Sequence, residues 1–98
     1  MNDASQTTIE AAVFKKLLSH LDSRKDAQNI DLMNLAGFCR NCLAKWYSAA
    51  AEEQGQDINY EAAREVVYGM PYSEWKALHQ TPASQDQLDA FKKSHKHP

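Results

Sequence analysis

The chain has 98 residues, of which 43% are hydrophobic and 24% are charged, and its formal net charge is −2 at pH 7. This length fits one domain over residues 1–98, and the composition excludes disorder over most of it. Acidic and basic residues are mixed, so no basic stripe favours nucleic-acid binding, and no apolar run approaches the roughly 20 residues that span a bilayer. We therefore expect neither a nucleic-acid partner nor a membrane partner.

The polar N-terminus lacks the basic and apolar segments of a secretory signal, which predicts a cytoplasmic protein. Only three glycines and three prolines occur, and strand-type alternation is nearly absent. These features predict an all-α fold, a multihelical single domain of four to five helices around a central buried helix. Residues 1–7 and 93–98 are expected to be flexible, because polar chain ends are the least firmly held parts of a domain.

The first predicted helix covers about residues 9–21. Thr7 and Glu10 have the spacing of a capping box, which satisfies free amide groups at the start of a helix. Apolar side chains recur at four-residue steps and form one face, namely Ile9, Val13, Leu17 and Leu21, with Phe14 and Leu18 beside them. The polar residues 22–29 then predict a linker.

The second predicted helix, about residues 31–54, is the central one. One face of it carries Leu32, Leu35, Ala36, Cys39, Leu43, Trp46, Tyr47 and Ala50. Further apolar residues widen this face on both sides, and a helix that is apolar over so wide an arc is surrounded by protein. Leu43 and Trp46 are therefore predicted to anchor the core or an interface. Gly55 is a suitable stop at the C-terminal end.

Three shorter helices are predicted in the rest of the chain. The first covers about residues 60–68, with Asn59 as its N-cap and Gly69 after its end. The next covers about residues 73–80. The last begins at Thr81, which precedes a first-turn proline, and its apolar stripe is thin.

Four stretches of the sequence carry a resemblance to a known family, namely Gln28–Leu43, Tyr68–Tyr72, Glu74–Lys76 and His79–Gln80, and two word-like blocks among them are specific. Together they resemble a family of small bacterial proteins catalogued as domain of unknown function 1244. The resemblance extends from about Phe14 to Phe91. It implies a bacterial protein with an all-α, multihelical fold and buried central helices. It implies no activity and no catalytic residue.

Cys39 and Cys42 form a Cys-x-x-Cys motif. A redox dithiol usually has its first cysteine at a helix N-terminus, whereas the predicted helix places Cys39 about two turns inside. A zinc site needs four ligands, and Cys39, Cys42 and His79 supply only three. We therefore expect no metal and no cofactor, with zinc at these residues as the alternative. The sequence favours two reduced, buried and poorly reactive thiols.

Arg40 and His79 are the other candidate site residues. Arg40 borders the apolar face, where it either binds a carboxylate or phosphate ligand or, as we favour, pairs with an Asp or Glu of a neighbouring helix. His79 is a candidate general base, although a packed imidazole is favoured. Five aromatic side chains are candidates for a pocket, an interface or the core, and the last two are favoured: Trp46, Tyr47, Tyr68, Tyr72 and Trp75.

These patterns identify neither a reaction nor a partner, and they leave open whether the protein is an enzyme. The leading interpretation is an interaction or accessory protein that forms a homodimer, with an unidentified protein as a further partner. Its basis is the helix over residues 31–54, whose apolar arc is wider than its short neighbours can cover. The alternative is a small enzyme or a metal- or ligand-binding protein with a site near Cys39, Cys42, Arg40 and His79.

Overall fold

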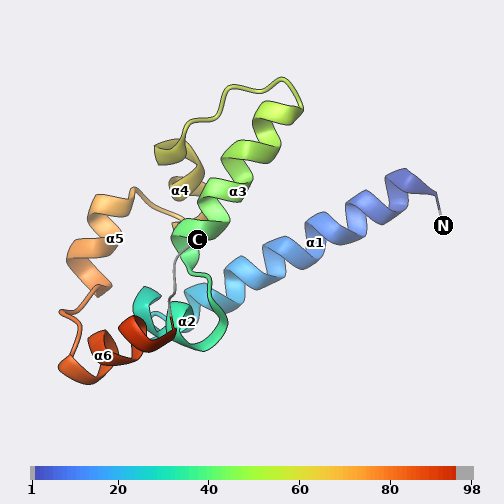
Figure 1. The fold of residues 1–98 in the computed structure, drawn as a ribbon. Coiled ribbons are helices and arrows are strands. Elements are labelled where there is room, and N and C mark those ends of the chain that lie inside the picture. The colour runs from blue at the N-terminus through green and yellow to red at the C-terminus, as the bar shows by residue number, and fades with distance from the viewer. Residues whose placement is uncertain (1, 95–98) are drawn as a thin grey trace.

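The structure is a computed structural model that describes residues 2–94, and these residues form six α-helices (Figure 1). The helices are α1 (Asp3–Asp22), α2 (Asn29–Ala36), α3 (Arg40–Glu53), α4 (Tyr60–Tyr68), α5 (Tyr72–His79) and α6 (Gln85–Ser94). No strand occurs in this range, so the predicted all-α class is confirmed.

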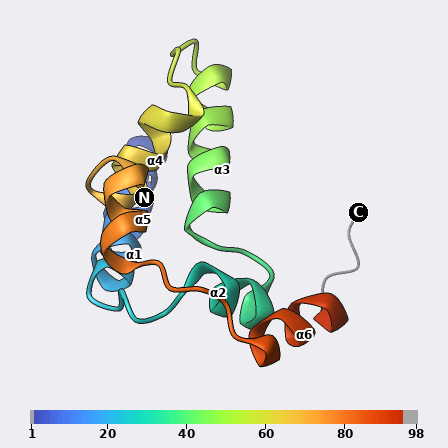
Figure 2. The ribbon, with the colours of Figure 1, turned by 90° about the vertical axis from the view of Figure 1, so that its left-hand side faces the viewer.

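The arrangement differs from four or five helices around a central one. The six helices of the described range fall into two groups: α4 contacts α1, α3 and α5, whereas α2 packs against α6 at one end of the molecule (Figure 2). Of the ends expected to be flexible, residues 1 and 95–98 lie outside the described range. Within it, residues 3–7 belong to α1 and residues 93–94 to α6.

The single helix predicted over residues 31–54 is wrong, because the structure has two helices there. α2 ends at Ala36, and Gly37 follows with a left-handed φ of 77°. An L-residue with a side chain rarely adopts this conformation, so the glycine ends the helix. Cys39 is extended, and α3 begins directly after it. The apolar pattern continues across the break, which is why periodicity alone did not reveal it.

Two helix starts also differ from the prediction. α1 begins six residues earlier than expected, and the side chain of Asn2, rather than Thr7, caps it by accepting a hydrogen bond from the Ser5 amide at 2.8 Å. α6 begins at Gln85 rather than near Thr81. There the Ser84 hydroxyl accepts from the Gln87 amide at 3.1 Å. In both cases a short polar side chain competes successfully for the free amides of the first turn.

The prediction for α4 is confirmed at both ends. Asn59 is its N-cap and accepts a hydrogen bond from the Ala62 amide at 2.8 Å. Gly69 follows its last residue with a φ of 74°. α3 likewise ends just before Gly55, whose φ is 76°.

The core lies where α1, α3, α4 and α5 meet. Its buried side chains are Leu21, Leu43, Ala44, Ala63, Val67, Tyr68 and Trp75. The core position predicted for Leu43 is thus confirmed, but Trp46 is not in the core, since 58% of it is exposed. Leu43, Ala44 and Tyr47 share the inward side of α3, and Trp46 lies about 100° away from the middle of that side.

The first half of α1 extends beyond the core (Figure 1). Residues 2–13 are all exposed, and the side chains of α1 reach the core only from Phe14 onward. The Cα radius of gyration is 15.2 Å, against about 12.5 Å for a compact domain of this length. Ile9 and Val13 are 49% and 64% exposed on this segment. We call residues 3–13 the α1 arm.

Candidate functional site

The first turn of α3 brings both cysteines to the N-terminus of a helix. Cys39 is the N-cap residue, and the Cys42 amide donates a hydrogen bond to the Cys39 carbonyl at 3.0 Å. The expected position of Cys39 about two turns inside a helix is therefore wrong, because the chain starts a new helix at Arg40. The sequence argues against a redox dithiol because the predicted helix places Cys39 far from its N-terminus, and this argument no longer holds.

The two thiols differ in exposure. Only 7% of Cys39 is exposed, whereas Cys42 is half-buried, and both are free cysteines. Burial raises the pKa of the Cys39 thiol, and the amides of Cys42 and Asn41 oppose this effect without cancelling it. Cys39 is therefore a protonated thiol at neutral pH.

Arg40 is buried and has no carboxylate partner among residues 2–94. Its exposed fraction is 2%. The guanidinium donates hydrogen bonds to four oxygens: the carbonyls of Ala27 (2.7 Å), Arg24 (3.0 Å) and Leu21 (3.3 Å), and Oδ1 of Asn29 (3.1 Å). The predicted pairing with an Asp or Glu is wrong, because no ion pair forms at Arg40 within the described residues.

The carbonyls of Leu21, at the end of α1, and of Arg24 and Ala27, in the turn that follows, explain how this charge is tolerated. The last carbonyls of a helix lack partners within it and carry partial negative charge, so they favour a cation. Burial lowers the pKa of Arg40, but an arginine stays protonated in proteins. The guanidinium also lies over the Trp75 ring, 5.0 Å from its centroid. Arg40 thus joins α3 to the end of α1 and to the turn that follows it, and each of its two terminal nitrogens already donates two hydrogen bonds.

A polar network continues from Arg40 to α4. Asn29 Oδ1 accepts from Arg40, and Asn29 Nδ2 donates to the Tyr68 hydroxyl at 3.0 Å. The Tyr68 hydroxyl donates in turn to Asn41 Oδ1 at 2.7 Å. Burial is the largest influence on this hydroxyl and raises the pKa of Tyr68 well above its usual range. Tyr68 is therefore a neutral hydrogen-bond donor across the physiological pH range.

His79 and most of the aromatic candidates pack together. The Trp75 ring lies 4.9 Å from that of Tyr68 and 5.4 Å from that of His79, and the rings of Tyr68 and Tyr72 are 5.1 Å apart. The backbone carbonyl of His79 accepts a hydrogen bond from the Gln28 side chain at 3.0 Å. This cluster belongs to the core and its margin.

The other two aromatic candidates lie apart from this cluster. Tyr47 stacks on Phe14 of α1, with ring centroids 6.3 Å apart. Trp46 stacks on Phe38 at the same distance. We call Phe38 and Trp46 the Phe38–Trp46 pair.

The metal candidates do not gather. Over residues 2–94, no three His, Cys, Asp or Glu side chains come close enough to hold a metal ion. Cys39, Cys42 and His79 therefore do not form a three-ligand group. Of these three candidates, the two thiols lie next to each other at the start of α3.

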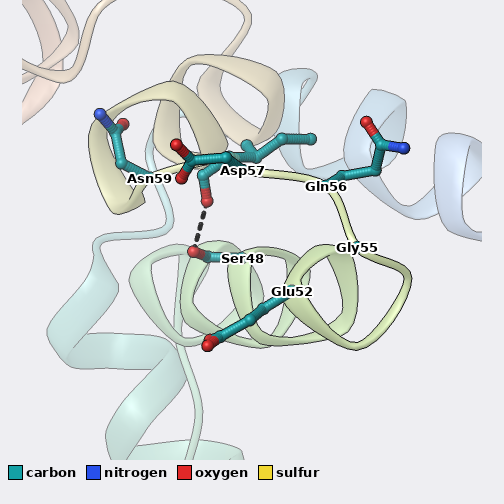
Figure 3. Close-up of a pocket in the computed structure, with 7 residues that line it drawn as sticks. Ser48, Glu52, Gly55, Gln56, Asp57 and Asn59 are labelled. Atoms are coloured by element: carbon teal, nitrogen blue, oxygen red, sulfur yellow. Dashed lines mark hydrogen bonds between the residues drawn. The ribbon is translucent and has the colours of Figure 1, made fainter.

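Several open hollows lie near polar side chains of the described residues, and two of them are compared with the predicted site. One, of about 430 Å³, lies between the end of α3 and residues 55–59, and the Ser48 hydroxyl donates there to the Ile58 carbonyl at 2.6 Å (Figure 3). Figure 3 shows the carboxylates of Glu52 and Asp57 on opposite sides of this bond, so they do not converge. None of the predicted site residues lines this hollow.

The second hollow, of about 270 Å³, adjoins the polar network and is lined in part by Asn29, Asn41, Tyr72 and Gln80. Sequence reasoning missed the two asparagines of this network. Asn41 belongs to the polar strip of its predicted helix, and nothing local indicates that it meets Tyr68, which is 27 residues further along the chain. Amide side chains that pair over such distances leave no periodic signal.

None of the described helices is both long enough and apolar enough to span a bilayer. A search of curated proteins finds no match for the chain. A family model described as "Protein of unknown function (DUF1244)" matches residues 27–93. The match begins after α1 and includes the first turn of α3, the polar network and the aromatic cluster. Since it covers well over half of the chain, the protein belongs to the DUF1244 family.

Proposed function

We propose that the protein is an interaction or accessory protein that works as a homodimer, and that the α1 arm forms the contact between the two copies. The observation that carries this proposal is an exposed helical segment whose side chains do not reach the core of their own chain. Residues 3–13 are helical, all are exposed, and two of them, Ile9 and Val13, are large and apolar.

The physical argument concerns helix stability. Isolated helices shorter than about 12–15 residues are marginal in water, and most helices in proteins are stabilised by packing of an apolar face. The arm continues the α1 stripe whose later members, Leu17 and Leu21, lie against the core. Covering Ile9 and Val13 would therefore stabilise the arm and remove apolar surface from water.

The charges of α1 favour a second copy of the chain as the partner that packs against the α1 arm. The first half of the helix carries Asp3 and Glu10, and the second half carries Lys15 and Lys16. Two α1 helices that cross antiparallel around Val13 bring unlike halves together, as a two-fold contact requires. In this register Ile9 lies opposite Leu17 of the second copy, and Glu10 lies at the level of Lys16 of the second copy.

Light scattering at micromolar concentration tests the dimer. We expect twice the chain mass of 11.1 kDa for the wild type and a single chain for Val13→Glu. The matched control is Leu78→Glu, since Leu78 on α5 is 69% exposed and its substitution should leave the dimer intact. A wild type that stays at 11.1 kDa would contradict the proposal.

A charge exchange tests the antiparallel register. Glu10→Lys and Lys16→Glu should each raise the dissociation constant about three- to tenfold, because each replaces two exposed attractions by repulsions. The double variant should regain most of the affinity. If the two effects instead add, Glu10 and Lys16 do not face each other across the dimer.

The Phe38–Trp46 pair is the competing dimer contact. The sequence predicts that Trp46 anchors the core or an interface. Since Trp46 is 58% exposed, an interface is the part of that prediction that is left. If Trp46→Ala yields a single chain while Val13→Glu remains a dimer, the contact lies at this pair and the α1 arm is not the interface.

The alternative function, a small enzyme or a metal- or ligand-binding protein, rests on the two thiols. Arg40 is held by backbone carbonyls, and His79 lies against Trp75. Metal analysis with native mass spectrometry, on protein purified without chelator or added metal, tests this alternative. Stoichiometric zinc that disappears in Cys39→Ala or Cys42→Ala would favour it over the interaction role.

A further inference from the structure

We propose that Cys39 and Cys42 are a redox-active dithiol that exchanges with low-molecular-weight disulfides and closes reversibly to an intramolecular disulfide at the start of α3. This site is separate from the proposed dimer contact, since neither cysteine belongs to α1. The proposal depends on three observations: the backbone turn that joins the cysteines, their position at a helix N-terminus, and their unequal exposure.

The backbone turn brings the two cysteines within bridging range. The Cys42 amide donates to the Cys39 carbonyl at 3.0 Å, and a turn closed by such a bond keeps its end Cα atoms within about 7 Å. Disulfides join Cα atoms that are usually about 4.4–6.8 Å apart. The separation of the two backbones therefore permits closure.

The helix N-terminus favours the chemistry. Thiol–disulfide exchange proceeds through a thiolate, and the free amides and dipole of a first helical turn stabilise negative charge. Cys39 is the N-cap of α3, and Cys42 lies in the first turn. Amides of Asn41 and Cys42 lie close enough to the Cys39 sulfur to act on it.

Exposure determines the order of the two steps. Cys42 is half-buried and open to a reagent, whereas Cys39 is 7% exposed. An external disulfide therefore reaches Cys42 first, because exchange requires access to the attacking sulfur. Burial also raises the pKa of Cys39, so a smaller fraction of it is thiolate, which further lowers its reactivity toward an external disulfide.

The reaction balances with a disulfide R–S–S–R as the oxidant. The Cys42 thiol loses its proton and attacks one sulfur, so a Cys42–S–S–R bond forms, the original S–S bond breaks, and the departing thiolate takes up the proton as R–SH. The Cys39 thiol then loses its proton and attacks the Cys42 sulfur, which releases a second R–SH. In total, two electrons and two hydrogens pass from the protein to the disulfide.

Treatment of the whole protein with oxidised glutathione, followed by intact-protein mass spectrometry, tests the proposal. The wild type should lose the mass of two hydrogens, retain no glutathione, and recover both thiols with dithiothreitol. Cys39→Ser should instead retain one glutathione on Cys42. Cys42→Ser should react at least about tenfold more slowly than Cys39→Ser, because only the buried thiol is left.

Several outcomes would overturn the proposal. These are a wild type that does not react, one that keeps a stable glutathione adduct, and one that forms disulfide-linked dimers. Equal rates for the two single variants would disprove the assigned order. The wild-type result needs no substitution, so it holds even if a variant fails to fold, and circular dichroism checks the fold of both variants.

Discussion

The α1 arm and the first turn of α3 show opposite relations between polarity and burial. The arm leaves Ile9 and Val13 exposed, whereas the turn buries the charged side chain of Arg40, with 2% exposed. Arg40 donates to four oxygens, while no side chain before Phe14 reaches the core. The stability of the single chain therefore resides at the junction of α1, α3, α4 and α5, and the arm contributes little until another surface covers it.

The size of the chain explains the reliance on this junction. A domain of this length buries a smaller fraction of its surface than a large one, so its apolar core is limited. Arg40 adds hydrogen bonds between segments that the core does not hold, including residues 24–29. Such bonds keep the end of α1 and the start of α2 in place beside α3.

Removing Trp75 should give the largest effect and sharpen this comparison. Trp75 is 2% exposed and contacts Arg40, Tyr68 and His79. Trp75→Ala should lower the free energy of unfolding by about 3–5 kcal/mol, the range for a large buried aromatic residue. Urea denaturation measures it. Trp46→Ala is the matched control and should cost less than about 1.5 kcal/mol, because Trp46 is mostly exposed.

Replacing Arg40 should have the next largest effect. Arg40→Met keeps the volume but removes the donors to three carbonyls, and buried acceptors without donors destabilise a fold. We expect a loss of about 2–4 kcal/mol in the free energy of unfolding. Val13→Ala, measured at low protein concentration, should change it by less than about 0.5 kcal/mol. Equal losses for the two variants would break the contrast between arm and junction.

Elements with local signals could be predicted from the sequence. Asn59 and Gly69 mark the ends of α4 through a side-chain cap and a left-handed glycine, and both signals act within one turn. Gly37 acts by the same mechanism, yet apolar residues at the helical period continue on both sides of it. Two helices in register therefore give the same pattern as one, and the break remained hidden.

The candidate site could be predicted only in part, for the same physical reason. The Cys-x-x-Cys spacing marks the thiols, but their chemistry depends on whether a helix begins at Arg40, which follows from Gly37. The partners of Arg40 lie 11 to 19 residues earlier in the chain. Hydrophobic periodicity depends on residues three or four positions apart in one helix, so it carries no information about hydrogen bonds between different segments.

The smallest expected effect concerns the Tyr68 hydroxyl. Tyr68→Phe removes its bonds to Asn29 and Asn41 and should lower the free energy of unfolding at neutral pH by about 1–2 kcal/mol. The matched control is Tyr72→Phe, which removes an exposed bond to Gln80 and should cost less than about 0.5 kcal/mol.

The Tyr68 hydroxyl also makes the free energy of unfolding depend on pH in the alkaline range. An unperturbed tyrosine has a pKa of 10.0, and burial raises the pKa of Tyr68 in the folded protein, so the fold favours its neutral form. This contribution is complete below the unfolded pKa and declines as the pH rises through it towards the folded value. Urea denaturation below and above pH 10 should therefore show the wild type losing more stability than Tyr68→Phe. Cys39, whose pKa burial also raises, is present in both proteins, so it cancels in this difference. Equal losses would mean that water reaches the Tyr68 hydroxyl, and that the junction is less tightly closed than its hydrogen bonds indicate.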